Sequence, residues 1–382
     1  MRKLFALLLA LALLPAFASA LSPEKRTCGA FEYVLLEDGT AEITGYTGTG
    51  ADMTIPAEVD GYSVTRIGDM AFYDREDLSG KLTIPEGIVR IGDSAFFNCQ
   101  FSGELALPDS LEVISEGAFC WCMCLTGSLK LPESLREIGE NAFRICIGLK
   151  GKVTIPAGVT YIGEGAFGGC TGLTLFTVSK GNENYKTVKG ILFTADGTVL
   201  LAAPGGKTMN DYVIPDGVTR IAKSAFENCD GLRGSITFPD SVTEIGEYAF
   251  QCCVYLTGEL RLPSGLKKIE GDAFYLCRGF TGKLVIPSGV TRIGWGAFSM
   301  CSGFTGKLDI PDTVAFIDSF AFNGCSRITS AAIPDSVKTI GEQAFGYDYK
   351  DGEFVPIHRF TISCGEGSAA AAYAAENGFA VK

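Results

Sequence analysis

Apolar residues recur along most of this chain in one pattern with a period of 23–24 residues. An Ala-Phe pair marks each unit, and an apolar-Pro pair precedes it in constant register. The Phe of the pair stands at positions 72, 96, 119, 143, 167, 226, 250, 274, 298, 322 and 345, with one long step of 59 residues between Phe167 and Phe226. Self-similarity at a fixed period of this length predicts a solenoid, in which each unit stacks on the next.

The positions within a unit predict its local structure. The apolar-x-apolar-Pro segment, as in 153–156, alternates with period two and predicts a short strand that ends at the proline, which has no N–H to donate. The following Val-x-x-Ile-Gly segment carries the chain round a bend, where we expect the glycine to supply conformational freedom. Ala-Phe then returns inward in a tight helical or irregular turn. Because one unit cannot bury its apolar face alone, equivalent side chains should form buried columns about 4.8 Å apart.

The predicted fold is therefore a repeat solenoid, mostly β with short helical turns. We expect a right-handed superhelix of about 11–12 coils over residues 51–350, closed by an N-terminal β-hairpin cap at 21–50 and a C-terminal cap at 351–382. In the C-terminal cap, a strand at 360–362 precedes an Ala-rich helix with Ser368 as its N-cap, ending at Gly378.

The long step between Phe167 and Phe226 predicts an insertion at about 179–211. Within it, 188–193 and 199–202 flank Asp196-Gly197, a strong signal for a β-hairpin turn. The hairpin is interpreted either as a packed decoration of the solenoid or as a protruding contact loop.

The first 20 residues have the features of an export signal. Arg2 and Lys3 precede an apolar run at 4–14, Pro15 interrupts it, and Ala18-Ser19-Ala20 is a small-x-small cleavage site. We expect cleavage after Ala20 and a secreted or cell-surface protein without membrane insertion. Loss of the two basic residues changes the formal charge from −12 to −14, which makes nucleic acid a poor partner.

The consensus Ile-Pro-x-x-Val-x-x-Ile-Gly-x-x-Ala-Phe-x-x-Cys resembles the BspA-like branch of leucine-rich repeat proteins, over nearly all of the mature chain. This resemblance implies a bacterial, secreted or surface-exposed protein associated with adhesion and with binding of host or neighbouring-cell proteins. Arg75 and Asp348 replace the cysteine in the first and last units, where atypical residues are expected.

Nine of the 14 cysteines follow the repeat Phe by three residues. We favour a ladder of buried free thiols there, with some disulfides or a metal site as alternatives, and consider Cys28, Cys120, Cys124, Cys252 and Cys364 the better candidates for oxidation. The predicted structural ladder comprises Phe96, Phe119, Phe143, Phe167, Phe226, Phe250, Phe274, Phe298 and Phe322 with Cys99, Cys122, Cys146, Cys170, Cys229, Cys253, Cys277, Cys301 and Cys325.

The single histidine, His358, makes Ser-His-Asp, Cys-His and multi-His metal chemistry improbable, so no catalytic residue, cofactor or metal is predicted. The hypothesis of an enzyme that uses carboxylates alone stays open. The leading hypothesis is a monomeric adhesion or protein-binding solenoid for an extracellular protein or glycoprotein. The alternative is carbohydrate binding on an aromatic platform such as Trp121 and Trp295. The predicted contact residues are Trp295, Arg261, Lys130, Asp309, Arg292, Arg220 and Tyr161.

Overall fold

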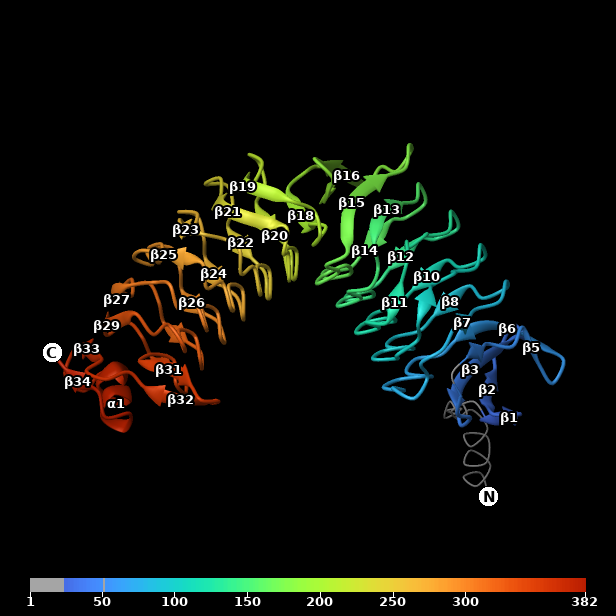
Figure 1. Cartoon of the computed structure of the whole chain (residues 1–382), viewed down its shortest axis with the longest axis horizontal. Coiled ribbons are helices and arrows are strands. Elements are labelled where there is room, and N and C mark those ends of the chain that lie inside the picture. The colour runs from blue at the N-terminus through green and yellow to red at the C-terminus, as the bar shows by residue number, and fades with distance from the viewer. Residues whose placement is uncertain (1–23, 51) are drawn as a thin grey trace, which may run out of the picture.

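The computed structural model describes residues 24–50 and 52–382, and the predicted export signal at 1–20 lies outside them. The chain winds into an arch whose two ends lie at its feet, with the insertion at its apex (Figure 1). The solenoid has about 15 turns, more than the 11–12 coils predicted, because the caps and the insertion add turns of their own. The Ala-Phe segments are tight turns and not helical, and α1 (Ala369–Glu376) is the one helix in the part of the chain that the structure describes.

Each regular coil contributes a two-residue strand that ends at the bend isoleucine, and these strands pair in parallel and in register. The first sheet joins β1 (Arg26–Cys28), β2 (Phe31–Leu35), β3 (Ala41–Tyr46), β6 (Tyr62–Ile67), β8 (Arg90–Ile91), β10 (Val113–Ile114), β12 (Glu137–Ile138) and β14 (Tyr161–Ile162), with β5 (Glu58–Val59) paired to β6. The second joins β16 (Tyr185–Val188), β17 (Ile191–Thr194), β18 (Val199–Ala202), β20 (Arg220–Ile221), β22 (Glu244–Ile245), β24 (Lys268–Ile269), β26 (Arg292–Ile293), β28 (Phe316–Ile317) and β30 (Thr339–Ile340). We call the surface of these two sheets that faces solvent, and not the apolar core, the sheet face.

The opposite side of the coils is built from the segments before the prolines, which form short separate sheets. Their strands are β4 (Met53–Thr54), β7 (Leu82–Thr83), β9 (Gly103–Glu104), β11 (Leu125–Thr126), β13 (Gly151–Ile155), β15 (Leu173–Val178), β19 (Met209–Val213), β21 (Leu232–Thr237), β23 (Gly258–Glu259), β25 (Phe280–Thr281), β27 (Gly306–Asp309) and β29 (Ile328–Ala332). As predicted, β13 stops immediately before Pro156. The apolar core lies between the two sides of the coil.

The insertion and the C-terminal cap differ in detail from the sequence prediction. Lys189 and Gly190 form a second tight turn at φ 50° and 79°, so the insertion has three strands, β16 to β18, where one hairpin was predicted. The C-terminal cap adds a hairpin, β31 (Tyr347–Lys350) and β32 (Glu353–Pro356), before β33 (Thr361–Ser363), α1 and β34 (Ala380–Val381). Ser368 is the N-cap of α1, which ends before the predicted Gly378, at a C-cap on Asn377.

The repeat phenylalanines form the predicted buried column. Their rings stack nearly parallel, from 5.1 Å between the centroids of Phe72 and Phe96 to 5.8 Å between Phe143 and Phe167. A second column starts at Phe226, whose centroid is 5.0 Å from that of Phe250, and continues to Phe345. Offset stacking adds to the burial of each ring, so every ring is held by both neighbouring coils.

The ladder cysteines are buried beside this column. The thiol of Cys146 donates to the carbonyl of Phe119 at 3.0 Å, and Cys277 donates to Phe250 at 3.1 Å in the same way. Burial raises the pKa of the Cys99 thiol to about 12, so it remains a protonated donor. All 14 cysteines lie in the described part of the chain and are free thiols there.

The bend glycines are needed because they lack a side chain, and not, as predicted, because their backbone is flexible. Gly92 and Gly246 do not adopt a left-handed conformation, but a Cβ on either would lie 2.7 Å from a backbone nitrogen of the preceding coil, that of Asp69 or Lys223. The glycine is needed because the coils approach one another closely at this point.

The left-handed residues lie instead in the Ala-Phe turn, directly before its Ala and two residues after its Phe. Many of these residues are not glycine, and they include Asn141, Tyr248, Asp272 and Phe320 at the first position and Trp121, Ile145, Leu276 and Met300 at the second. Such a conformation costs about 1–2 kcal/mol for an L-residue. The turn offsets this cost with hydrogen bonds between coils, such as that from Phe96 N to Ala118 O at 2.8 Å.

Candidate binding surface

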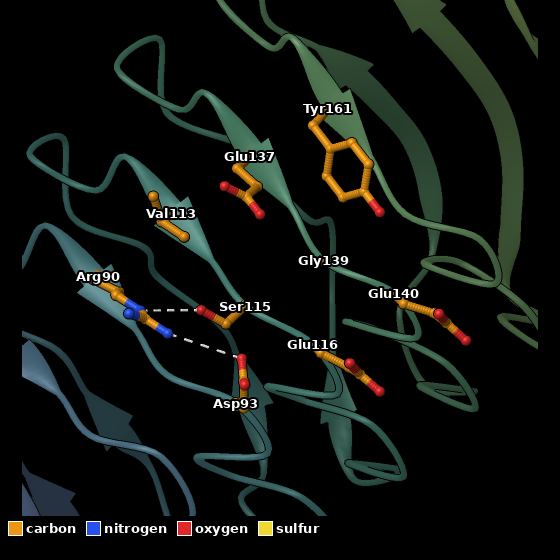
Figure 2. Close-up of a pocket in the computed structure, with 9 residues that line it drawn as sticks. All are labelled: Arg90, Asp93, Val113, Ser115, Glu116, Glu137, Gly139, Glu140 and Tyr161. Carbon is orange, nitrogen blue, oxygen red and sulfur yellow. Dashed lines mark hydrogen bonds and ion pairs between the residues drawn. The ribbon is translucent and has the colours of Figure 1, made fainter.

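The sheet face of the N-terminal arm, which we define as β1 to β15, contains a shallow pocket of about 440 Å³ (Figure 2). It lies over β8, β10, β12 and β14, whose exact register sets the spacing of the side chains above them. The residues that line it are Arg90, Asp93, Val113, Ser115, Glu116, Glu137, Gly139, Glu140 and Tyr161. Because β8, β10 and β12 pair with strands on both sides and β14 pairs with β12, the side chains stand on a rigid frame.

One end of the pocket is closed by Arg90. Its Nε donates to the hydroxyl of Ser115 at 3.2 Å, and its Nη2 lies 3.6 Å from Asp69 Oδ1 and 3.9 Å from Asp93 Oδ1. Ser115 is almost fully buried, so this contact holds the guanidinium against the sheet. The Arg90 charge is therefore neutralised by two carboxylates of its own arm.

The centre of the pocket has carboxylates without a counter-ion. Glu116 and Glu137 are exposed and form no ion pair with any residue in 24–50 and 52–382. Val113 and the half-exposed ring of Tyr161 lie beside them and provide an apolar surface (Figure 2). Glu140, at the other end, is 2.6 Å from the Nζ of Lys223. The arrangement suits a cationic side chain, whose aliphatic stem would cover the apolar surface while its charge meets the free carboxylates.

The pocket is part of a longer acidic column. The position two residues before the repeat alanine is acidic in five successive coils of the N-terminal arm, at Asp69, Asp93, Glu116, Glu140 and Glu164. Stacked coils place these carboxylates about 4.8 Å apart at the backbone. The sequence analysis did not single out this column, although five acids in one register are a visible signal.

The predicted contact residues lie on two different sides of the solenoid. Tyr161, Arg220, Arg292 and Trp295 belong to the sheet face, whereas Lys130, Arg261 and Asp309 lie on the opposite side, next to the prolines. The last three each take part in an exposed ion pair, with Glu104, Glu259 and Lys283. Only Tyr161 of the seven lines the acidic pocket, so the structure does not gather them into one site.

Arg220 and Arg292 are engaged within the protein. Arg220 contacts Glu164 and lies 2.9 Å from Glu244, and Arg292 is 2.7 Å from Asp318. Trp295 is 52% exposed and packs edge-on against Phe320, with 5.7 Å between the ring centroids. It lines a second, open pocket of about 310 Å³ with Asp318, Ser319 and Thr339.

The single histidine of the chain does not line the acidic pocket. His358 is exposed between β32 and β33, far along the chain from the acidic pocket. Within the described residues, no three His, Cys, Asp or Glu side chains are grouped so that they could hold a metal ion. No helix among those residues has the length and apolar character to cross a membrane.

The coil geometry, with its repeated bend isoleucine, Ala-Phe turn and buried cysteine, defines a leucine-rich-repeat solenoid. The family model described as "BspA type Leucine rich repeat region (6 copies)" matches residues 60–192, 205–305 and 267–354. The chain therefore belongs to the BspA-type leucine-rich repeat family.

Two solved structures support the same fold. A leucine-rich cell-surface protein of Faecalibacterium prausnitzii A2-165 is similar at 27% identity and a TM-score of 0.50, over 86% of this chain and 93% of that one. The pneumococcal vaccine antigen PcpA is similar at 20% identity and a TM-score of 0.56, over 94% and 98% of the two chains. No curated protein sequence matches the chain.

Proposed function

We propose that this protein is a non-enzymatic extracellular binding protein that docks a protein or glycoprotein partner on the sheet face of its N-terminal arm. The observation that supports the proposal best is the acidic pocket, in which Glu116 and Glu137 stand unpaired beside Val113 and Tyr161 on a rigid sheet. The family and its surface-protein neighbours are consistent with binding or adhesion at a cell surface. The partner chemistry that fits is a segment bearing Lys or Arg side chains.

The charge pattern supports one-sided docking. A partner with basic side chains is attracted to an acidic chain, and the unpaired carboxylates are where that attraction is not already neutralised. The aromatic and aliphatic surface between them adds cation–π and stem contacts for a bound Lys or Arg.

The test is capture of extracellular proteins or host-cell extract on the mature chain, with the variant Glu116→Lys/Glu137→Lys. A matched control is Glu133→Lys/Glu366→Lys, which changes two exposed acids away from the sheet face by the same charge. We expect one extracellular protein to be captured by the wild type and by the control, and the pocket variant to bind that protein at least tenfold more weakly. Equal capture by both variants would contradict the proposed site, and no capture by any form would contradict the function.

A second candidate function is carbohydrate binding at Trp295. The observation in its favour is the exposed indole beside an open pocket with hydroxyl and carboxylate groups from Ser319, Thr339 and Asp318. An aromatic face can stack on the C–H face of a sugar ring while such groups accept and donate to its hydroxyls. A glycan array that scores the wild type and Trp295→Ala alike would reject it.

A further inference from the structure

Neighbouring coils are joined in the same way along each arm, but not across the insertion. The first parallel sheet ends at β14 and the second begins at β16, with no strand pairing between them. Phe167 is the last ring of the first column, stacked on Phe143 with ring planes at 5° and tilted by 54° against Phe176, while Phe226 starts a new column with Phe250. The buried apolar residues accordingly fall into two clusters.

The open edge of the first sheet is closed by a side chain. The hydroxyl of Tyr185, the first residue of β16, accepts a hydrogen bond from the N–H of Ile162 at 2.7 Å. The insertion is also tied to both arms through its backbone. The N–H of Gly206 donates to Leu173 O at 2.8 Å, and that of Ala203 donates to Ala225 O at 2.7 Å.

Charged side chains also link the two arms directly across the insertion. Arg144 forms a two-bond fork with Glu227, 83 residues further along the chain, with Nε to Oε2 at 2.7 Å and Nη2 to Oε1 at 2.6 Å. The side chain of Glu227 is only 2% exposed, and the Arg144 guanidinium also lies 4.8 Å from the ring centroid of Tyr248. This is the most buried ion pair among the described residues.

Two further cations strengthen this seam. Lys223 is 2.6 Å from Glu140 of the N-terminal arm and 4.0 Å from Glu247 of the C-terminal arm, β19 to β34. Arg220 contacts Glu164 on one side and Glu244 on the other. Each cation thus bridges carboxylates from both sides of the insertion.

Burial alone would lower the pKa of Arg144, but its hydrogen bonds to Glu227 raise it, so the guanidinium stays charged. A buried carboxylate deprived of its partner is far less stable than one that is paired. The pairing of one sheet with the next and the stacking of the phenylalanine column, which join the regular coils, are both interrupted here, and charged side chains link the two arms directly.

We propose that this seam is a joint: the two arms are separate cooperative units, and the Arg144–Glu227 pair together with Lys223 and Arg220 fixes the angle of the arch. The insertion is then the connecting piece about which the arms move when the seam opens. The arch angle sets the distance between the acidic pocket on one arm and the exposed Trp295 on the other.

The test uses the full mature chain with a pair of fluorophores introduced through unnatural amino acids at the exposed residues Glu58 and Asp351, one in each arm. Arg144→Gln breaks the seam, and the matched control Arg292→Gln breaks the Asp318 pair inside the C-terminal arm. We expect Arg144→Gln to broaden the inter-arm distance distribution, and hydrogen exchange at the turns of Phe143 and Phe226 to rise at least tenfold. The control should change neither.

A second variant keeps the test decisive if Arg144→Gln does not fold. Glu140→Gln/Glu164→Gln removes two half-exposed partners of Lys223 and Arg220, so its distance distribution should be wider than that of the wild type at low salt. High salt should widen the distribution of the wild type more than that of this variant, because the pair that remains between the arms is buried and little screened. An unchanged distance distribution in the folded variants, with hydrogen exchange that remains uniform across the insertion, would overturn the joint.

Discussion

Phe119 in the N-terminal arm and Phe274 in the C-terminal arm have nearly identical surroundings, since each is fully buried and stacks on the ring of the next coil at 5.5 and 5.4 Å. The surfaces above them differ. The column that is acidic in five successive coils of the first arm continues in the second as Lys223, Glu247, Gly271, Trp295, Ser319 and Glu342. Interior positions are constrained by coils on both sides, whereas surface positions contact mainly solvent and are free to specialise. The comparison places the determinants of the fold in the shared interior, and the proposed binding function rests on the differing surface.

The largest expected effect tests the shared interior. Phe119→Ala and Phe274→Ala should each lower the free energy of unfolding by about 3–5 kcal/mol, because each leaves a ring-sized cavity between two coils. Phe316→Ala, at a 47% exposed ring, is the control and should cost far less. Urea unfolding checks this, and a much smaller loss in one arm than in the other would break the equivalence.

The bend glycines give the next largest effect. Gly92→Ala in one arm and Gly246→Ala in the other should each cost about 1–3 kcal/mol, because the new Cβ meets backbone that cannot move away easily. Ser115 occupies the same position and already has a Cβ, so Ser115→Ala should be milder. Thermal melts of the three variants measure the difference. Glycine variants as stable as wild type would contradict the close approach of the coils.

The C-terminal arm and the insertion should differ in how a buried or hydrogen-bonded aspartate makes stability depend on pH. Burial, and then the charge of Glu247, raise the pKa of Asp272 to about 6. The native state therefore holds this proton more tightly than the unfolded chain does, so the protonated Asp272 favours folding at low pH and this advantage is lost as pH rises through 6. Asp272→Asn should stabilise the protein by about 1–3 kcal/mol at pH 7.5 and have little effect below pH 4.

Asp196 is the control for the sign of this effect. Hydrogen bonds from Thr194 and Thr198 lower its pKa to about 2, so its ionised form favours folding above the unfolded pKa. Asp196→Asn should reduce stability at neutral pH, with the loss disappearing in strong acid. Urea unfolding at several pH values checks both variants, and parallel pH profiles for the two would show that the Asp272 assignment is wrong.

The smallest expected effect is that of the acidic pocket on the free energy of unfolding. Glu116→Gln/Glu137→Gln should change the free energy of unfolding by less than about 0.5 kcal/mol, because these exposed carboxylates have no counter-ion to lose. Asp318→Asn, which removes the partner of Arg292, should cost slightly more and should become neutral in high salt. A clear loss from the glutamine variant would indicate that the acidic pocket serves folding and not binding.

The repeat could be predicted from the sequence because one period fixes every interior position at once. The Phe and Cys columns and the strand that stops before Pro156 follow from local chemistry repeated in register, and the Ser368 cap follows from the local preference of a helix N-terminus. The role predicted for the bend glycine was wrong because the true role depends on how closely two coils approach each other, and no single unit reveals that distance. Likewise, the turn at Lys189-Gly190 has no strong turn dipeptide, and the third strand of the insertion was missed.

The surface was less predictable than the interior. Variation along a column showed which positions face outward, but not that Arg220 would be held by Glu164 and Glu244 or that Lys130 and Tyr161 would lie on opposite sides. The link between Arg144 and Glu227 spans 83 residues and an insertion, so no spacing rule could pair them. Such contacts depend on how the arms meet, and only the folded chain determines that.

The most direct test of the proposed docking surface is photo-cross-linking from a single position. Tyr161→benzoylphenylalanine places the probe in the acidic pocket, and Val285→benzoylphenylalanine places it at a 63% exposed position outside the sheet face of the other arm. The account predicts a covalent adduct with an extracellular protein from position 161 alone, lost when Glu116→Lys/Glu137→Lys is added. Equal adducts from both positions, or an adduct at 161 that survives the charge reversal, would contradict it.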